Sequence, residues 1–168
     1  MSLFSQEFNS LEDLFLNQIE DLYDAEHRII RALPKMIDAA QSPDLKQAFE
    51  THLNETRHQV ERLDTIFQQL GQQPQRETCE AMKGLIREGE EMASAKGDPT
   101  VRDAALIAAA QRIEHYEMAG YGTVRSLAQL LGHHEAARLL QSTLAEEQSA
   151  DKKLTQVAES TINVNAVR

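Results

Sequence analysis

Residues 107–131 read IAAAQRIEHYEMAGYGTVRSLAQLL, and this stretch decides the fold. Read at spacings of three and four, one side of it forms an apolar helix face that two acids interrupt. The members of that face are Ile107, Ala110, Glu114, Glu117, Tyr121, Val124, Ala128 and Leu131. Because an amphipathic helix buries its apolar face against other helices, the pattern predicts a helical core that contains carboxylates.

Two further stretches repeat this arrangement, and a third resembles it. The inner stripe after residue 134 is Ala137, Leu140, Leu144, Glu147, Asp151, Leu154 and Ala158, and the stripe near the N-terminus is Phe15, Ile19, Leu22, Glu26, Ile29 and Leu33. In the remaining stretch an apolar stripe passes through Phe49, Leu53, Thr56 and Val60, with His52, Glu55 and Gln59 together on one flank. That flank could face the same centre as the other acids.

The chain is organised as four long helices and one short one. Expected helices span about residues 11–41, 44–70, 78–95, 100–131 and 134–160. Ser10 is expected to be the N-cap of the first helix, and Pro34 to kink that helix. Residues 161–168 are expected to form a polar, frayed tail. Few Gly and Pro residues favour an all-α class, and the length suits one domain. The long link between two helical hairpins, carrying the short helix, favours a ferritin-like four-helix bundle, although an up-and-down bundle with an inserted helix also explains it.

Composition excludes several kinds of partner. A net charge of −10 disfavours nucleic acid and anionic membranes, and no apolar run approaches the ~18 residues of a membrane span. The N-terminal sequence has no basic start or continuous apolar segment of the kind that a signal peptide needs. Cys79 is the single cysteine and forms no internal disulfide. A reducing, cytoplasmic location is therefore expected.

Counting residues from the two hairpin turns places four glutamates at similar heights along the predicted bundle. With hairpin turns near residues 42 and 132, Glu26 and Glu55 lie 16 residues before and 13 after the first turn, while Glu114 and Glu147 lie 18 before and 15 after the second. The common offset of three residues is about 4.5 Å along a helix, which is within side-chain reach. All four glutamates are therefore expected to converge.

Four buried carboxylates need compensating charge. A single acid in such a seam more often pairs with Lys or Arg or faces solvent, but the seams around Glu114 and Glu147 offer no basic partner. Two divalent cations would balance four carboxylates, and oxygen ligands with an imidazole suit iron or manganese. The sequence leaves open whether His52, His58 or Gln59 completes the ligands, with His52 favoured because His58 points further from the apolar stripe.

Other chemistry-bearing residues carry weaker signals. Tyr116 and Tyr121 could be redox-active neighbours, although core tyrosines with one hydrogen bond are more common. His115, His133 and His134 are expected at the surface, and Cys79 has no partner for nucleophilic chemistry.

Four segments resemble the YciE/YciF-type stress-protein family of the ferritin-like, rubrerythrin-like di-iron superfamily: DLYDAEHRIIRALPKM, AFETHLNETRHQVERL, VRDAALIAAAQRIEHYEMAGYGTV and LLQSTLAEEQSADKKL. The resemblance implies a di-iron bundle, usually a homodimer, in a bacterial cytoplasm. Carried over by position, it assigns the metal ligands Glu26, His52, Glu55, Glu114, Glu117, Glu147 and Asp151. Relatives of this kind commonly lack histidine at the position of His58.

The resemblance further implies two irons per chain that react with O2 or H2O2, as in a ferroxidase or a peroxide-reducing enzyme. Glu55 and Glu147 would then bridge the irons, with Glu26 and Glu114 as terminal ligands. The rubredoxin segment of a full rubrerythrin is absent from this sequence, so the reductant and physiological substrate are open. The alternatives are a non-catalytic helical stress or structural dimer with a structural metal or none, and an iron-storage shell.

Overall fold

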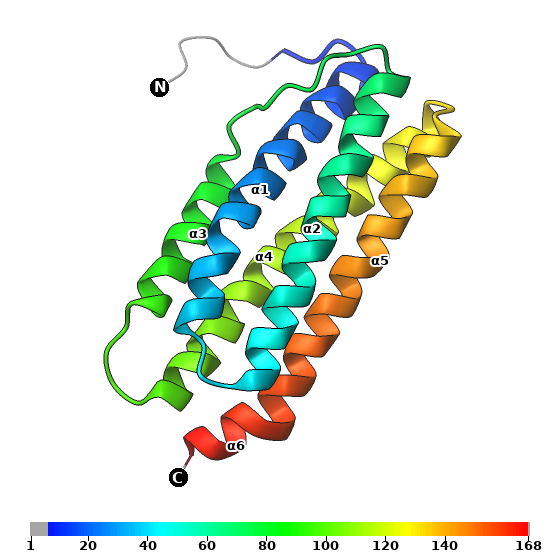
Figure 1. Ribbon diagram of the computed structural model, residues 1–168. Coiled ribbons are helices and arrows are strands. Elements are labelled where there is room, and N and C mark those ends of the chain that lie inside the picture. Colours follow the sequence, from blue (N-terminus) through cyan, green and yellow to red (C-terminus); the bar gives the residue numbers. More distant parts are fainter. Residues whose placement is uncertain (1–6, 168) are drawn as a thin grey trace.

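The computed structural model describes residues 7–167, which form a bundle of long helices (Figure 1). The elements are α1 (Leu11–Ala39), α2 (Pro43–Gln69), α3 (Glu80–Ala93), α4 (Pro99–Leu130) and α5 (His134–Val157), followed by the π-helical turn η1 (Ala158–Ile162) and α6 (Asn163–Ala166). The short α3 packs against α1 and α4 on the outside of the bundle. These elements confirm the all-α, ferritin-like bundle with a long crossover that carries a short helix.

Local sequence signals set the ends of the helices. Ser10 caps α1 by accepting a hydrogen bond from the Asp13 amide at 3.0 Å, as expected. Asp98 caps α4 in the same way through the amides of Thr100 and Val101. Gly132 has a φ of +83° in the α4–α5 turn, a conformation that glycine adopts without strain. Helix α1 continues past Pro34 to Ala39 without a break.

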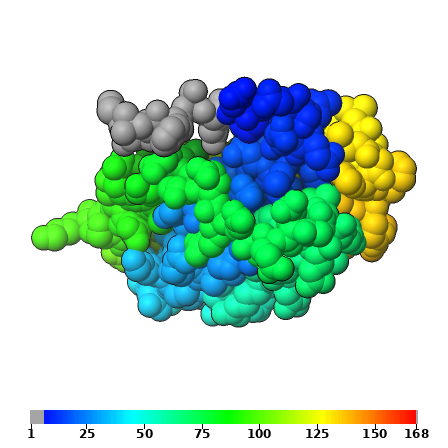
Figure 2. Space-filling view, turned by 90° about the horizontal axis from the view of Figure 1, so that it is seen from above, coloured from blue at the N-terminus to red at the C-terminus, as the bar shows by residue number. Residues whose placement is uncertain are grey.

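The end of the molecule at which α1 begins is closed by the α4–α5 turn. Figure 2 shows this end, with the yellow turn beside the blue start of α1. His133 stacks on Phe15 with ring centroids 5.7 Å apart, and its Nε2 atom lies 2.8 Å from Glu12 Oε1. The hairpin of α4 and α5 is thereby held against α1.

The core consists of two apolar clusters with a polar layer between them. One cluster includes Phe15, Phe67 and Tyr121, and the other includes Phe49 and Ile107. Between them, each long helix contributes buried polar residues, namely Glu26, His52, Thr56, Gln59, Glu114, Glu117 and Glu147. We call these seven residues the polar layer. Its position midway along the bundle agrees with the expected height of the seam acids.

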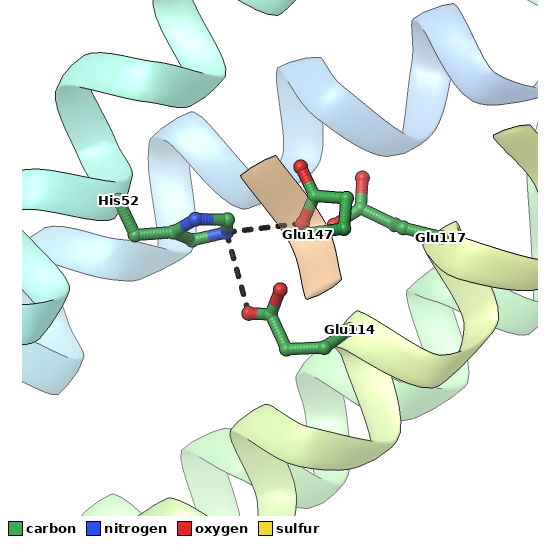
Figure 3. A group of neighbouring side chains, drawn as sticks. All are labelled: His52, Glu114, Glu117 and Glu147. Carbon is green, nitrogen blue, oxygen red and sulfur yellow. Dashed lines mark ion pairs between the residues drawn. The ribbon is translucent and has the colours of Figure 1, made fainter. Parts of the chain in front are cut away.

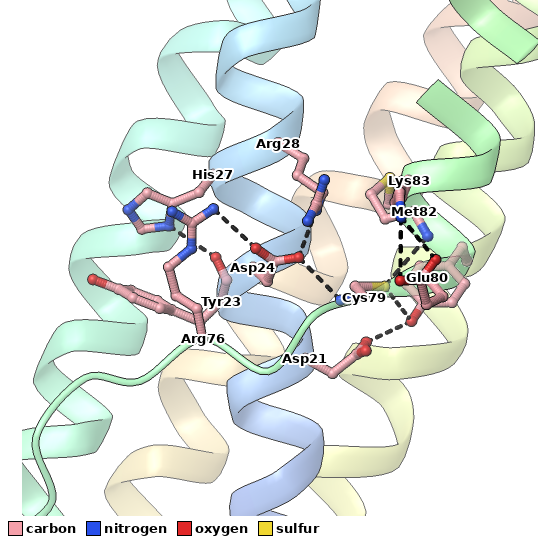
Figure 4. A network of polar contacts seen from close by, with 11 residues as sticks. Asp21, Tyr23, Asp24, His27, Arg28, Arg76, Cys79, Glu80, Met82 and Lys83 are labelled. Carbon is pink, nitrogen blue, oxygen red and sulfur yellow. Dashed lines mark hydrogen bonds and ion pairs between the residues drawn. The ribbon is translucent and has the colours of Figure 1, made fainter. Parts of the chain in front are cut away.

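The crossover is fastened to α1 by Asp24 (Figure 4). This buried carboxylate accepts hydrogen bonds from Arg28 Nε at 2.5 Å, Arg76 at 2.9 Å and the Cys79 amide at 3.0 Å. The Cys79 sulfur in turn caps α3 and lies 3.0 Å from the hydroxyl of Tyr116. Asp24 therefore fixes where α3 begins.

The C-terminal segment differs from the expected frayed tail. Helical structure continues through η1 and α6, and Ile162 is only 1% exposed within a core cluster. The reason is that Ile162 continues the spacing of four set by Leu154 and Ala158, which outweighs the polar composition of the segment.

No helix within residues 7–167 combines the length and the apolar character needed to cross a membrane. Residues 1–6, on which the expected lack of a signal peptide partly rests, and Arg168 lie outside the described residues.

Candidate metal centre

Four buried side chains from three helices meet in the polar layer (Figure 3). His52 of α2, Glu114 and Glu117 of α4, and Glu147 of α5 each offer one ligand atom, and these atoms lie within 4.8 Å of one another. His52 Nε2 is 3.3 Å from Glu114 Oε1 and 3.9 Å from Glu147 Oε2. Such a group has the size and donor types of a metal site.

Helix geometry explains why these residues converge. Glu114 and Glu117 are three residues apart and so project from one face of α4. The short turn at Gly132 makes α4 and α5 antiparallel neighbours, which brings Glu147 to the same height. His52 enters from α2, which packs against both α1 and α5.

Glu26 adjoins this group from α1. It is fully buried, and its Oε1 atom accepts a hydrogen bond from the hydroxyl of Tyr121. Tyr121 is therefore a core tyrosine with one hydrogen bond, the more common of the two roles that the sequence suggested, and it orients one carboxylate of the layer. Tyr116 instead donates to Asp21 at 2.5 Å, away from the layer.

Many polar atoms of the layer are left without a hydrogen-bond partner in the described part of the chain. They are Glu26 Oε2, both His52 ring nitrogens, Gln59 Oε1, Glu114 Oε2, both Glu117 carboxylate oxygens and Glu147 Oε2. Burying an ionised group without a partner costs several kcal/mol, so this arrangement is unfavourable by itself. The unpaired carboxylate oxygens and imidazole nitrogens are the donor set that fits divalent iron or manganese.

Burial and neighbouring charges shift the pKa values of the titratable groups in the polar layer. The pKa values of Glu26, Glu114 and Glu117 are raised well above the usual value for glutamate. Burial is the largest cause, and the charge of neighbouring carboxylates is the second. Burial lowers the pKa of His52, but the nearby carboxylates of Glu55 and Glu147 outweigh burial and raise it. Protons and cations would therefore compete for the same oxygens.

A hydrogen-bonded series of side chains from α2 and α5, formed by Gln59, Glu146 and Arg62, supports Glu147. Gln59 donates to Glu147 and, at 3.1 Å, to Glu146 Oε2. Arg62 contacts both oxygens of Glu146 at 2.6 and 2.7 Å. Sequence reasoning considered Gln59 only as a ligand and missed Glu146 and Arg62. The spacing of three between Gln59 and Arg62, opposite the Glu146–Glu147 pair, is a signal that could have found them.

Three of the expected ligands lie outside the four-residue group: Glu26, which adjoins it, and Glu55 and Asp151, which lie further out. Glu55 sits on the outer side of the His52 ring, with its side chain 36% exposed and an oxygen 3.7 Å from Nδ1. Asp151 is half-buried and accepts a hydrogen bond from Gln111 at 3.0 Å, with His115 Nε2 at 3.2 Å. It is four residues beyond Glu147, about 6 Å along the helix. His58 is exposed.

Sequence comparison relates the chain to one protein family and to a stress protein's sequence in Escherichia coli. Residues 10–167 match the family described as a domain of unknown function, DUF892. The chain is 45% identical to protein YciF of Escherichia coli K12 over 158 residues, which cover 94% of this chain and 95% of YciF.

Solved structures match the fold. The crystal structure of the E. coli stress protein YciF superposes with a TM-score of 0.89 at 44% identity, covering 93% of this chain and 99% of that chain. YcfI from Rhodopseudomonas palustris superposes with a TM-score of 0.88 at 47% identity, with the same two coverages. A protein from Xanthomonas campestris, at 19% identity and a TM-score of 0.73, shares the fold. The chain described here therefore belongs to the DUF892 family.

Proposed function

We propose that the polar layer binds two metal ions, iron in the first place and manganese as the alternative, and that the protein serves in a stress response. The observation that carries the proposal is the set of unpaired, buried carboxylate and imidazole atoms within reach of one another. The stress role is supported by the relationship to YciF, which is described as a stress protein.

Five residues would hold the metal ions. They are Glu26, His52, Glu114, Glu117 and Glu147, and their four carboxylates balance the charge of two divalent cations. Tyr121 fixes the orientation of Glu26, and Gln59 fixes that of Glu147. Such outer partners commonly make a large contribution to metal affinity.

Bound iron would supply the electrons with which O2 or H2O2 is reduced, which makes a ferroxidase or peroxide-reducing activity the proposed reaction class. The protein's own contribution is a site that excludes bulk water, because all five residues are at most 5% exposed. The acids whose pKa is raised are positioned to hold protons until metal replaces them.

Anaerobic titration of the metal-free protein with Fe(II) tests the proposal. We expect two ions per chain, and a loss of at least one in Glu147→Gln, which keeps the shape of the side chain but removes its charge. Asp151→Asn is the matched control and should still bind two. Absence of saturable binding to the wild-type protein would overturn the proposal.

A non-catalytic role is the second candidate, because YcfI of R. palustris is provisionally described as a structural protein. Adding O2 or H2O2 to the Fe(II)-loaded protein separates the two roles. Absorbance between about 300 and 400 nm that develops faster than in a protein-free control supports redox chemistry. Tight binding with no such acceleration supports a structural metal.

From the family resemblance we also propose a cytoplasmic homodimer. Sedimentation equilibrium over a concentration series checks the oligomeric state, since the dimer has twice the 18.9 kDa chain mass. A monomeric mass throughout would contradict it.

A further inference from the structure

A large cavity occupies the half of the bundle that contains the α1–α2 turn. Its volume is about 730 Å3, and residues of all five main helices line it. Sites for small organic molecules typically enclose about 300–1,000 Å3, so the cavity has the size of a ligand site. It lies apart from the cluster that packs Phe15 and Tyr121 at the other end.

Most of the lining is apolar. Ile29, Leu33, Met36 and Phe49 form part of the wall, and small residues such as Ala110 and Gly89 leave the space between them open. A side-chain carbon added at Gly89 would meet its nearest neighbour, Met36 Sδ, at 3.8 Å, an ordinary contact distance. Exposed residues such as Lys35, Asp38 and Thr51 also line the cavity, so it is open to solvent. An apolar molecule would displace water from the apolar wall and gain dispersion contacts there.

The cavity reaches the candidate metal centre. His52 and Glu114 belong both to its lining and to the four-residue group. They are 5% and 3% exposed, and His52 Nε2 and Glu114 Oε2 have no hydrogen-bond partner among the described residues. A molecule in the cavity can therefore place one polar end beside these atoms and the rest of its length against apolar side chains.

The charges of the lining select against an anionic occupant. Its acids are Asp38, Glu55, Glu90 and Glu114, and its basic side chains among the described residues are Lys35, Lys153 and the imidazole of His52. One of these, Lys35, is already paired with Glu90 at 2.6 Å. The lining therefore offers a carboxylate or phosphate no surplus of positive charge, and the net charge of −10 of the whole chain disfavours an anion.

We propose that this cavity binds an uncharged, largely aliphatic small molecule that carries a hydrogen-bonding oxygen at one end, with that oxygen beside His52 and Glu114. The binding itself rests on the cavity alone. Any reaction of this molecule at the metal centre would rest on the proposed function.

Binding is tested on the full-length, metal-free protein with 1-octanol, by displacement of the uncharged fluorophore 1-aminoanthracene. We expect saturable binding, and at least tenfold weaker binding of octanoate at pH 7.5. Ala110→Leu and Ala48→Leu fill the cavity from opposite walls and should each weaken octanol binding at least tenfold. Ala81→Leu, on the exposed face of α3, should leave it unchanged.

The proposal is overturned if octanol does not bind saturably, or if both filling variants fold and bind octanol like the wild type. Two filling variants are used because one substitution in a core can disturb folding, which circular dichroism reports. Octanoate binding as tight as that of octanol would overturn the assignment of an uncharged ligand.

The orientation of the ligand is tested with Mn(II) in the metal centre. Paramagnetic relaxation of octanol should be greatest at its C1 protons and least at the terminal methyl group. The reverse order would overturn the placement of the oxygen. If octanol binds but Mn(II) and Fe(II) do not, the proposed function fails while the cavity proposal stands.

Discussion

Two buried acids of α1, only two residues apart, have opposite surroundings. Asp24 is 4% exposed and accepts hydrogen bonds from Arg28, Arg76 and the Cys79 amide. Glu26 is 0% exposed, and Tyr121 is the single donor recorded for it among the described residues. Residues at i and i+2 point to different sides of a helix, so Asp24 faces the crossover and Glu26 faces the bundle interior.

The pKa values of the two carboxyls diverge accordingly. Burial raises the pKa of Asp24, but the hydrogen bonds from Arg28 and Cys79 and the nearby arginine charges outweigh burial and lower it. For Glu26, burial and the charge of Glu147 both raise the pKa. Burial of an acid is thus compatible with a purely structural role, whereas unpaired oxygens beside further carboxylates mark a candidate cation site.

The largest expected effect that separates the two acids is thermal stabilisation by metal. At a free Mn(II) concentration about 1,000 times the dissociation constant, binding adds about 4 kcal/mol to the free energy of unfolding. For a chain of this size that raises the Tm by about 10 °C. Differential scanning calorimetry should show the rise in the wild type and in Asp24→Asn, but not in Glu26→Gln. If Mn(II) also failed to raise the Tm of Asp24→Asn, the proposed difference between the two acids would be contradicted.

The next effect is the pH dependence of the metal-free protein. Since the pKa values of Glu26, Glu114 and Glu117 are raised on folding, the native state holds more protons than the unfolded state above pH 4.5. Stability should therefore fall as the pH rises through the folded-state pKa values, by about 1.4 kcal/mol per pH unit for each retained proton.

Urea unfolding between pH 5 and 8 with a chelator present measures this slope. In Glu117→Gln one of the titrating groups is gone, so the slope should be shallower and the protein about 1 kcal/mol more stable at the upper end. A wild-type stability that rises with pH over this range would contradict the protonated state of the layer.

The smallest of the three effects concerns the crossover. Asp24→Ala leaves the partly buried Arg28 side chain and the Cys79 amide without their acceptor, which should destabilise the metal-free protein by about 2 kcal/mol. Amide hydrogen exchange at Cys79 should accelerate at the same time. Asp38→Ala, an exposed position on the same helix, is the control and should change stability by less than about 0.5 kcal/mol.

Much of the candidate site could be predicted from residue spacing. Of the four acids expected at one level, Glu26, Glu114 and Glu147 are buried, and Glu114 and Glu147 belong to the four-residue group, whereas Glu55 lies at its edge. His52 is buried and His58 is exposed, as the position of His52 nearer the apolar stripe indicated, while ligation by His52 stays a prediction.

Less could be predicted where contacts come from distant segments. The anchor formed by Asp24, Arg76 and Cys79 joins α1 to an irregular part of the crossover, whose path no periodic pattern describes. The support of Glu147 by Gln59, with Arg62 and Glu146 behind it, depends on the way in which α2 and α5 face each other.

The sequence by itself determined the helices, the apolar faces and the height at which acids enter the core, because these follow from spacing along a single helix. Only the tertiary structure decided which residues of α2 turn inward. Its packing against α1 and α5 buries the stripe of His52, Thr56 and Gln59 and leaves Glu55 at the edge. The rotation of a helix about its own axis is set by the side chains of its neighbours, and its own periodicity leaves that rotation undetermined.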